Sequence, residues 1–403
     1  MKIGIIREGK VPVDKRVPLL PEQCQLLQKK YPQLSFVVQS SPIRCIADEA
    51  YHQAGLSVVD DISDCDVILG VKEVPIPQLV EGKTFFFFSH TIKKQAYNQR
   101  LLRTILDQRI HLVDYECLTD ANGNRIVAFG RFAGVVGAYN GILGYGKRHH
   151  LFELRRAHEC RDLKDLRTEF DKVKLPAIKI VVTGGGRVGN GITEVLEGMN
   201  IERVSPADFL NKTFTYPVFT QLRSKDYYTP AEGNTWNSEE FYQDPTSYQA
   251  DFLKYAHQAE ILISGHYWNP EADVLFTKED MTKPEFKIEV VADVTCDIEG
   301  SIPSTLRATT IDAPFYDYNP TNGREVSAFS SFEHINVMTV DNLPCELPYD
   351  ASEAFGNQLM EYVFPAFFDG DAQEIIKRAS ITKDGELTPI YNYLSDYANE
   401  ETV

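Results

Sequence analysis

The chain has 403 residues, too many for one ordinary hydrophobic core, and therefore predicts two domains. It carries 58 acidic and 41 basic side chains, and the resulting formal net charge of -17 argues against a nucleic-acid or anionic-membrane surface. The seven cysteines are scattered and contain no C-x-x-C pair, so neither a metal site nor a disulfide framework is expected. The N-terminus soon turns charged, and no window of about 18 residues is apolar throughout, so we expect a cytoplasmic protein.

The first third of the chain alternates short apolar segments with segments of helical pattern. Strands are expected at "KIGIIRE", "SFVVQ", "CDVILGV", "KTFFFFS" and "HLVDYE", and helices at "PEQCQLLQKKY", "IADEAYHQAG" and "QAYNQRLLRTILDQ". This alternation predicts βαβ units and a parallel sheet. The small, apolar segment "GRFAGVVGAYNGILGYGKR" is then expected to be a helix that crosses between domains.

Three of these strands end in ionisable side chains. Lys72 and Glu73 follow the third strand, His90 follows the phenylalanine-rich strand, and Glu116 follows the fifth. Ligands of open α/β sheets lie outside the carboxyl ends of the strands, so these side chains are predicted to share one crevice. A lysine and a histidine together suit proton transfer near neutral pH. Taken alone, such a lysine would usually be solvated and such a histidine structural, and only their occurrence on consecutive strands favours a site.

Two arginines are candidate clamps for a substrate carboxylate. Arg16 stands with Asp14 in the loop between the first strand and the first helix, and Arg125 lies in "NGNRIVAFGRFAG". A guanidinium binds a carboxylate through two parallel hydrogen bonds, which fixes the orientation of the ligand. The alternative for Arg16 is an ordinary surface arginine.

A second α/β series begins at "AIKIVVTGGGRVGNGITEVLEGM". Gly184, Gly186 and Gly189 form a G-x-G-x-x-G motif between an apolar strand and a helix, with Arg187 and Val188 between the last two glycines. In this context the motif predicts a dinucleotide-binding turn with the pyrophosphate at the helix N-terminus. An ordinary strand–turn–helix connection is the alternative.

The choice between NAD and NADP is left open. The second strand of this series is predicted at "IERVS", ending at Ser205, and it lacks the acid that often binds the ribose hydroxyls about 20 residues after the glycines. A 2′-phosphate is therefore possible, with Arg203, Arg223 and Lys225 as its candidate partners. The polar, tyrosine-rich stretch from residue 205 to 259 is expected to be a long insertion with some short helices.

Several blocks of the sequence resemble the enzymes of lysine metabolism that form or oxidise saccharopine. These blocks are "VILGVKEVPIPQLVEGKTFFFFSHTIKKQAYNQRLL", "LVDYECLTDANGNRIVAFGRFAG" and "VMTVDNLPCELPYDASEAFG". The family comprises the lysine-forming saccharopine dehydrogenases and the lysine–2-oxoglutarate reductase half of the bifunctional aminoadipic semialdehyde synthases. More distantly it includes alanine dehydrogenase and transhydrogenase. "ISGHYWNPEADVLFTKEDM" is more similar to the reductase half.

This resemblance implies two Rossmann-like α/β domains with parallel sheets and an active site in the cleft between them. Residues 1–143 and 345–403 are expected to form the substrate domain, and residues 144–344 the dinucleotide-binding domain. The implied reaction interconverts saccharopine with L-lysine plus 2-oxoglutarate by hydride transfer to or from NAD or NADP. The expected partners are these small molecules, and the expected assembly is a monomer or a small homo-oligomer.

The resemblance also implies roles for the residues that match the family's motifs. Lys72 and His90 match the acid–base pair: the lysine takes the proton of the secondary amine during oxidation, and the histidine assists water attack on the imine. Arg16 and Arg125 match the arginines that bind substrate carboxylates.

The acidic residues of the motifs are assigned in the same way. Glu116 matches a catalytic glutamate and Glu73 a substrate-side glutamate, with Asp14 in place of a third acid. "VDNLP" supplies Asp341 near the nicotinamide, and "VADVTCD" supplies Asp293 on the cofactor side. Two alternatives share these features: an alanine-type amino-acid dehydrogenase, and a dinucleotide-binding sensor that has lost catalysis.

Overall fold

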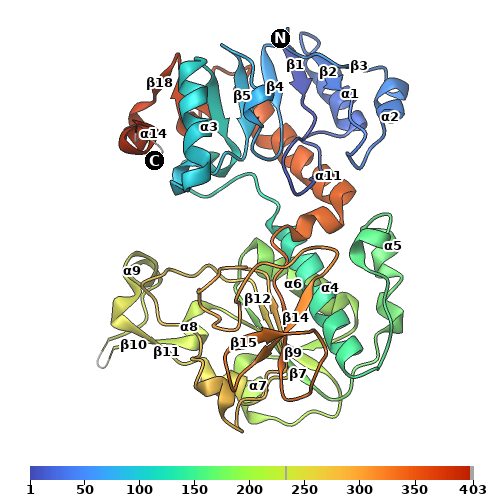
Figure 1. Cartoon of the computed structure of the whole chain (residues 1–403), viewed down its shortest axis with the longest axis vertical. Helices are drawn as coiled ribbons and strands as arrows, with labels where there is room; N and C mark the ends of the chain where they lie inside the picture. Colours follow the sequence, from blue (N-terminus) through green and yellow to red (C-terminus); the bar gives the residue numbers. More distant parts are fainter. Residues whose placement is uncertain (232–233, 400–403) are drawn as a thin grey trace. The chain divides into compact units, whose positions relative to one another are not determined.

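The computed structural model describes residues 1–231 and 234–399. The described chain forms two compact units: Met1–Phe129 together with the segment from Pro348 onward, and Gly130–Leu347 (Figure 1). Helix α4 (Gly130–Arg148) therefore lies wholly in the second unit, whereas the sequence placed the boundary at residue 143. None of the helices formed by the described residues is long and apolar enough to cross a membrane.

The first unit is built on a six-stranded, fully parallel sheet in the order β3-β2-β1-β4-β5-β6. Its strands are β1 (Lys2–Ile5), β2 (Ser35–Gln39), β3 (Ser57–Val59), β4 (Val67–Leu69), β5 (Thr84–Phe87) and β6 (His111–Asp114). The helices are α1 (Pro21–Lys30), α2 (Asp48–Gln53), α3 (Ala96–Asp107), α11 (Pro348–Gln358), α12 (Phe364–Ala366), α13 (Ile375–Ala379) and α14 (Ser395–Asn399). A short hairpin, β17 (Thr382–Lys383) and β18 (Glu386–Leu387), completes the unit. The predicted parallel α/β architecture is confirmed.

The phenylalanine-rich strand β5 is buried on both faces of this sheet, as its sequence predicts. Phe86 and Phe88 lie in the core formed with α1, α2 and α11. Phe85 and Phe87 lie in the opposite core, with α3 and the C-terminal segment. The strand thus packs against the helices on both faces of the sheet.

The second unit contains an eight-stranded sheet in the order β15-β14-β16-β13-β12-β7-β9-β8. The parallel strands are β7 (Lys179–Thr183), β8 (Glu202–Arg203), β9 (Val218–Leu222), β12 (Ile261–Ser264), β13 (Val290–Asp293) and β16 (Ile335–Met338). The antiparallel edge is the hairpin β14 (Phe315–Asn319) and β15 (Arg324–Val326). The helices besides α4 are α5 (Leu163–Arg167), α6 (Arg187–Gly198), α7 (Pro206–Asn211), α8 (Ser224–Tyr227), α9 (Ser238–Gln243) and α10 (Leu253–Ala256).

The expected second strand of this unit is not the neighbour of the first. β8 lies at the sheet edge, and β9 pairs with β7 along its whole length. The stretch from residue 205 to 259 is therefore not only an insertion, because it supplies a strand next to β7. Ser205, predicted at the cofactor, follows the edge strand, and its hydroxyl accepts a hydrogen bond from the Asp208 N–H to cap α7. The rest of the stretch folds around the small hairpin β10 (Tyr228–Pro230) and β11 (Tyr248–Ala250).

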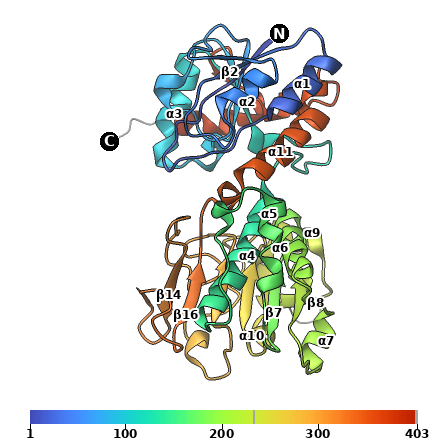
Figure 2. The same cartoon turned by 90° about the vertical axis from the view of Figure 1, so that its right-hand side faces the viewer.

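Helices α4 and α6 lie side by side on one face of this sheet because both carry glycines where they meet (Figures 1 and 2). A Cβ on Gly134 would lie 2.0 Å from the carbonyl oxygen of Val188, and a Cβ on Gly191 would lie 2.1 Å from that of Arg131. Since these neighbours are backbone atoms, neither glycine can be enlarged without moving a helix. The close packing sets the position of α6, which opens directly after the glycine-rich turn.

We predict that Gly134→Ala lowers the free energy of unfolding of the second unit by about 1–3 kcal/mol, the usual penalty of overpacking. Both tryptophans, Trp236 and Trp268, lie in this unit, so urea unfolding followed by tryptophan fluorescence measures it. Gly130→Ala is the matched control, because its Cβ would meet the nearest side-chain atoms at an ordinary 3.4 Å. Equal stability of the two variants would contradict the packing argument.

Candidate functional site

The carboxyl ends of β4 and β5 bring an acid–histidine pair together in the first unit. Nδ1 of His90 lies 2.6 Å from Oε1 of Glu73, and Oε2 of Glu73 lies 2.5 Å from Nζ of Lys10. His90 has a left-handed backbone (φ 54°), which is uncommon for a residue with a side chain. The predicted proximity of Glu73 and His90 is observed, and Lys10 is an addition that no motif of the sequence selects.

Electrostatics keeps Glu73 ionised in this cluster. Burial alone would raise its pKa, but hydrogen bonds from His90 and Lys10 outweigh burial and lower the pKa to about 2. An ionised Glu73 requires a proton on Nδ1 of His90, which leaves Nε2 as the basic nitrogen of the neutral ring. The pair therefore fixes the tautomer of His90.

Lys72 stands next to Glu73 with an amine that is easier to deprotonate than usual. Burial is the main cause of its lowered pKa, and the positive charge of Arg16 adds to it. Arg16 is itself buried and holds Asp14 through two hydrogen bonds, from Nε at 3.0 Å and from Nη2 at 2.6 Å. Its guanidinium also lies 4.1 Å from the ring centroid of Phe129. Binding of a substrate carboxylate by Arg16 stays a prediction.

Glu116 follows β6 and stands between two cations. Its Oε1 lies 3.6 Å from Nζ of Lys93 and 3.8 Å from Nη1 of Arg125. Its Oε2 is buried without a hydrogen-bond partner among the described residues, which is uncommon for a carboxylate oxygen. Oε2 of Glu116 can therefore accept a hydrogen bond from a donor group of a ligand. The two cations beside it, Lys93 and Arg125, suit a carboxylate of a ligand. Nothing in its sequence context distinguishes Lys93 from a solvated lysine.

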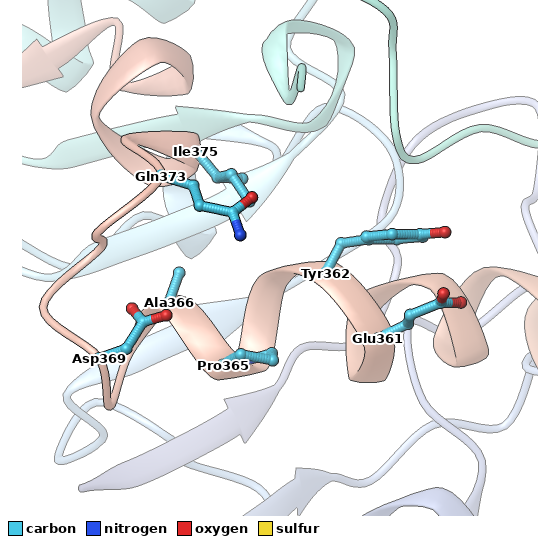
Figure 3. A pocket seen from close by; sticks show the side chains of 7 residues that line it. All are labelled: Glu361, Tyr362, Pro365, Ala366, Asp369, Gln373 and Ile375. Atoms are coloured by element: carbon cyan, nitrogen blue, oxygen red, sulfur yellow. The ribbon is translucent and has the colours of Figure 1, made fainter. Parts of the chain in front are cut away.

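A separate hollow in the first unit lies between the helical turn before α12 and the segment that enters α13 (Figure 3). Its lining contains none of the predicted site residues and consists of Glu361, Tyr362, Pro365, Ala366, Asp369, Gln373 and Ile375. Among the described residues, no group of three or more His, Cys, Asp or Glu side chains is placed to hold a metal ion.

The glycine-rich turn of the second unit has the shape that a pyrophosphate needs. Gly184 has a φ of 99°, and its Cβ would lie 2.5 Å from the carbonyl oxygen of Gly265. A Cβ on Gly189 would lie 2.1 Å from the carbonyl oxygen of Gly184, whereas a Cβ on Gly186 would meet no atom within 4 Å. Gly186 therefore faces open space at the N-terminus of α6, where backbone N–H groups bind phosphate. α6 opens with the other two predicted turn residues, Arg187 and Val188.

Arg223, at the end of β9, stands beside this turn, and Arg203 of β8 reaches it through Gln221. A Cβ on Gly185 would lie 3.4 Å from Cγ and 3.5 Å from Nε of Arg223, so the Arg223 side chain runs along the turn. Arg203 donates to Oε1 of Gln221 at 2.6 Å, and Nε2 of Gln221 donates to the Gly184 carbonyl at 2.9 Å. The strand next to β7 thus ends in a cation, where NAD-binding domains commonly carry an acid.

The two predicted cofactor-side acids differ in their surroundings. Asp293, at the end of β13, is buried, and its carboxylate accepts hydrogen bonds from the hydroxyls of Ser264, Thr295 and Thr305, each at 2.6 Å. It therefore organises the loops at this sheet edge. Asp341 follows β16 and is exposed. Direct contact of either acid with a cofactor stays a prediction.

Comparison with solved structures places this fold among two-domain dehydrogenases. L-alanine dehydrogenase matches with a TM-score of 0.67 and 17% identity, over 98% of this chain and 99% of that one. The transhydrogenase from Sinorhizobium meliloti matches with a TM-score of 0.60 and 15% identity, over 96% and 99%. Residues 4–136 match the family described as "Alanine dehydrogenase/PNT, N-terminal domain".

Comparison with curated proteins is more specific. The mitochondrial alpha-aminoadipic semialdehyde synthase of Mus musculus is 30% identical over 429 residues, and the alignment covers 94% of this chain and 46% of that protein. The Arabidopsis thaliana synthase is 28% identical over 97% and 41%. "Saccharopine dehydrogenase [NAD(+), L-lysine-forming]" of Emericella nidulans is 25% identical over 89% and 90%. The predicted resemblance is confirmed: the chain belongs to the family of saccharopine dehydrogenases and aminoadipic semialdehyde synthases, and it spans less than half the length of the synthases.

We predict that Glu73→Gln flattens the acid dependence of the first unit's stability. The folded-state pKa of Glu73, about 2, is below its usual 4.5, so the carboxylate stabilises the fold above pH 4.5. This contribution, on the order of 3 kcal/mol, is lost as the pH falls from 4.5 toward 2. Urea unfolding by circular dichroism between pH 6 and about 3 measures it, with tryptophan fluorescence as the reference for the second unit. Exposed Glu81→Gln is the control, and equal pH slopes in both variants would contradict the prediction.

Proposed function

We propose that the chain is an NAD(P)-dependent oxidoreductase of lysine metabolism that interconverts saccharopine with L-lysine plus 2-oxoglutarate. The observation that carries this proposal is the cluster of Lys72, Glu73 and His90, which supplies a depressed lysine pKa and a histidine of fixed tautomer at one sheet edge. The names of the relatives in both branches of the family support the substrate class.

The proton transfers follow from the electrostatics of this cluster. Burial disfavours the charged ammonium of Lys72, so its amine is more easily available as a base than that of an ordinary lysine. Lys72 accepts the proton that the secondary amine loses during oxidation. Nε2 of His90 accepts a proton from water as the water oxygen attacks the carbon of the protonated imine, which gives a neutral carbinolamine. His90 then returns this proton to the nitrogen, the C–N bond breaks, and the hydroxyl proton passes to the released amine, which leaves the oxo acid. The pyridine nucleotide supplies hydride transfer when it is bound.

Substrate recognition is assigned to the charged groups around Glu116. The unpartnered Oε2 of Glu116 accepts a hydrogen bond from a substrate ammonium, which no described residue offers it. Lys93 and Arg125, each about half-exposed, pair with substrate carboxylates. A substrate with several carboxylates and amino groups needs such a mixed set, even on an acidic protein.

We expect that Lys72→Met and His90→Gln each reduce turnover by at least about 100-fold, the usual contribution of a general acid or base. Turnover is the oxidation of NADH or NADPH in the presence of lysine plus 2-oxoglutarate. Dinucleotide binding, measured by calorimetry, should stay unchanged, because the glycine-rich turn belongs to the other unit. Wild-type turnover in both variants would reject the assignment.

The same assay distinguishes the alternatives. Turnover with ammonia plus pyruvate in place of lysine plus 2-oxoglutarate would identify an alanine-type dehydrogenase. Dinucleotide binding without turnover by any amino-acid and oxo-acid pair would identify a sensor. The assembly state stays a prediction. The cytoplasmic location also stays a prediction, and it differs from the location in the name of the Mus musculus relative, which includes "mitochondrial".

We propose NADP as the preferred cofactor, because Arg223 stands where an acid would bind the ribose hydroxyls of NAD. We expect that Arg223→Ala lowers kcat/KM for NADPH by about 10- to 100-fold, the usual loss of a charge-assisted hydrogen bond, with little change for NADH. Weaker binding of 2′,5′-ADP but not of 5′-AMP, measured by calorimetry, gives the same answer without turnover. Arg161→Ala is the control, since the Arg161 side chain is 80% exposed. Equal losses for both dinucleotides would refute the preference.

A further inference from the structure

Glu8 is a buried acid that neither the sequence motifs nor the proposed proton transfers use. It lies three residues beyond β1, and only 8% of it is exposed. Its Oε1 accepts a hydrogen bond from the N–H of Val71 at 2.6 Å, and its Oε2 accepts one from the N–H of Lys72 at 2.9 Å. Both carboxylate oxygens are thus engaged with consecutive main-chain groups at the proposed catalytic lysine.

These two hydrogen bonds continue the sheet where its backbone pairing stops. The last backbone bond between β1 and the end of β4 runs from the Ile6 N–H to the Leu69 carbonyl at 3.0 Å. Beyond it, β4 is still held on its other side, because the Phe88 N–H donates to the Val71 carbonyl at 3.0 Å. On the β1 side, the Glu8 side chain takes the place of the missing backbone acceptors. The segment that carries Lys72 is therefore fixed from both sides.

A buried acid at this position does not add to the stability of the fold near neutral pH. Burial, and then the charge of Asp14, raise the pKa of Glu8 to about 8, although the two N–H groups and Arg16 act in the opposite direction. The ionised carboxylate is therefore disfavoured in the folded state, and its contribution to stability falls as the pH rises from 4.5 toward 8. The charged and titratable groups around it are Asp14, Arg16, Lys72 and Tyr115. Stability alone gives no reason for an acid here.

We propose that Glu8 is a positioning residue that fixes the main chain of Lys72, and thereby holds the lysine amine in its buried place. The proposal rests on the proposed function in taking Lys72 as the proton acceptor. It does not depend on which substrate is turned over. Glu8 has no contact with the reacting atoms in this scheme and acts only through the segment that it holds.

Two substitutions separate the position of the side chain from the presence of a carboxyl group. Glu8→Gln keeps the length of the side chain but presents an NH2 group to one of the two N–H donors, so one hydrogen bond is lost. Glu8→Asp keeps the carboxyl group but is one methylene shorter and cannot reach both donors. Asp66→Asn is the matched control, because Oδ2 of Asp66 accepts the Lys2 N–H at 2.7 Å at the opposite end of the same sheet.

The first measurement needs no turnover. The full-length protein is labelled with acetic anhydride over a range of pH, and the rate of modification of Lys72 is read by mass spectrometry. In both Glu8 variants we expect the midpoint of the labelling profile to move to higher pH, because the freed segment exposes the amine to water. In Asp66→Asn we expect the wild-type profile. An unchanged profile in both Glu8 variants, or an equal shift in the control, would overturn the proposal.

The second measurement is steady-state kinetics with lysine, 2-oxoglutarate and NADPH. We expect both Glu8 variants to lose at least about tenfold in kcat, with KM for lysine changed less than about threefold. Full activity in Glu8→Asp with a loss in Glu8→Gln would also overturn the proposal, since the carboxyl group itself rather than its reach would then matter. If the wild type does not turn over these substrates, the proposed function fails, and the labelling profiles still decide the role of Glu8.

Discussion

The in-register parallel pairing of β1, β4, β5 and β6 is the constraint on which the candidate site depends. Each pair is hydrogen-bonded in the same direction, so all four strands end at one edge of the sheet. Lys10, Glu73 and His90 come from three separate segments of the sequence, and this pairing brings them within hydrogen-bond distance. A slip of one residue would turn the phenylalanines of β5 to the wrong faces, so the two aromatic cores also fix the register of the site.

The candidate sites of the two units are built from different kinds of groups. The first unit uses side chains: Glu73 orients His90, and Arg16 lies beside Lys72. The second uses backbone: Gly186 faces open space at the N-terminus of α6, where main-chain N–H groups suit a phosphate, and the Arg223 side chain runs along the turn. The glycines between α4 and α6 let the two helices pack closely, and this packing fixes the N-terminus of α6 beside the glycine-rich turn.

Sequence patterns predicted the parallel sheets and the glycine-rich turn because these depend on local periodicity and spacing. The order of β8 and β9 could not be predicted, since both strands are short and only long-range pairing distinguishes the edge from the neighbour of β7. Lys72, Glu73 and His90 could be predicted to lie together because each follows a strongly apolar strand, and Glu73 and His90 do meet in the structure. Lys10 and Glu8 were missed because they stand in a loop, and only the fold shows that this loop reaches the ends of other strands.

The surroundings of Lys72 explain why desolvation, rather than repulsion, is the main influence on its pKa. Arg16 would repel an ammonium, but Asp14 pairs with Arg16 and attracts the same ammonium. Glu8 lies close by, yet its own burial favours the neutral acid, so it adds little attraction near neutral pH. The charges therefore largely cancel, and burial remains the largest cause of the shift. A site of this kind is sensitive to whatever admits water, which makes the main-chain position of Lys72 as important as any single charge beside it.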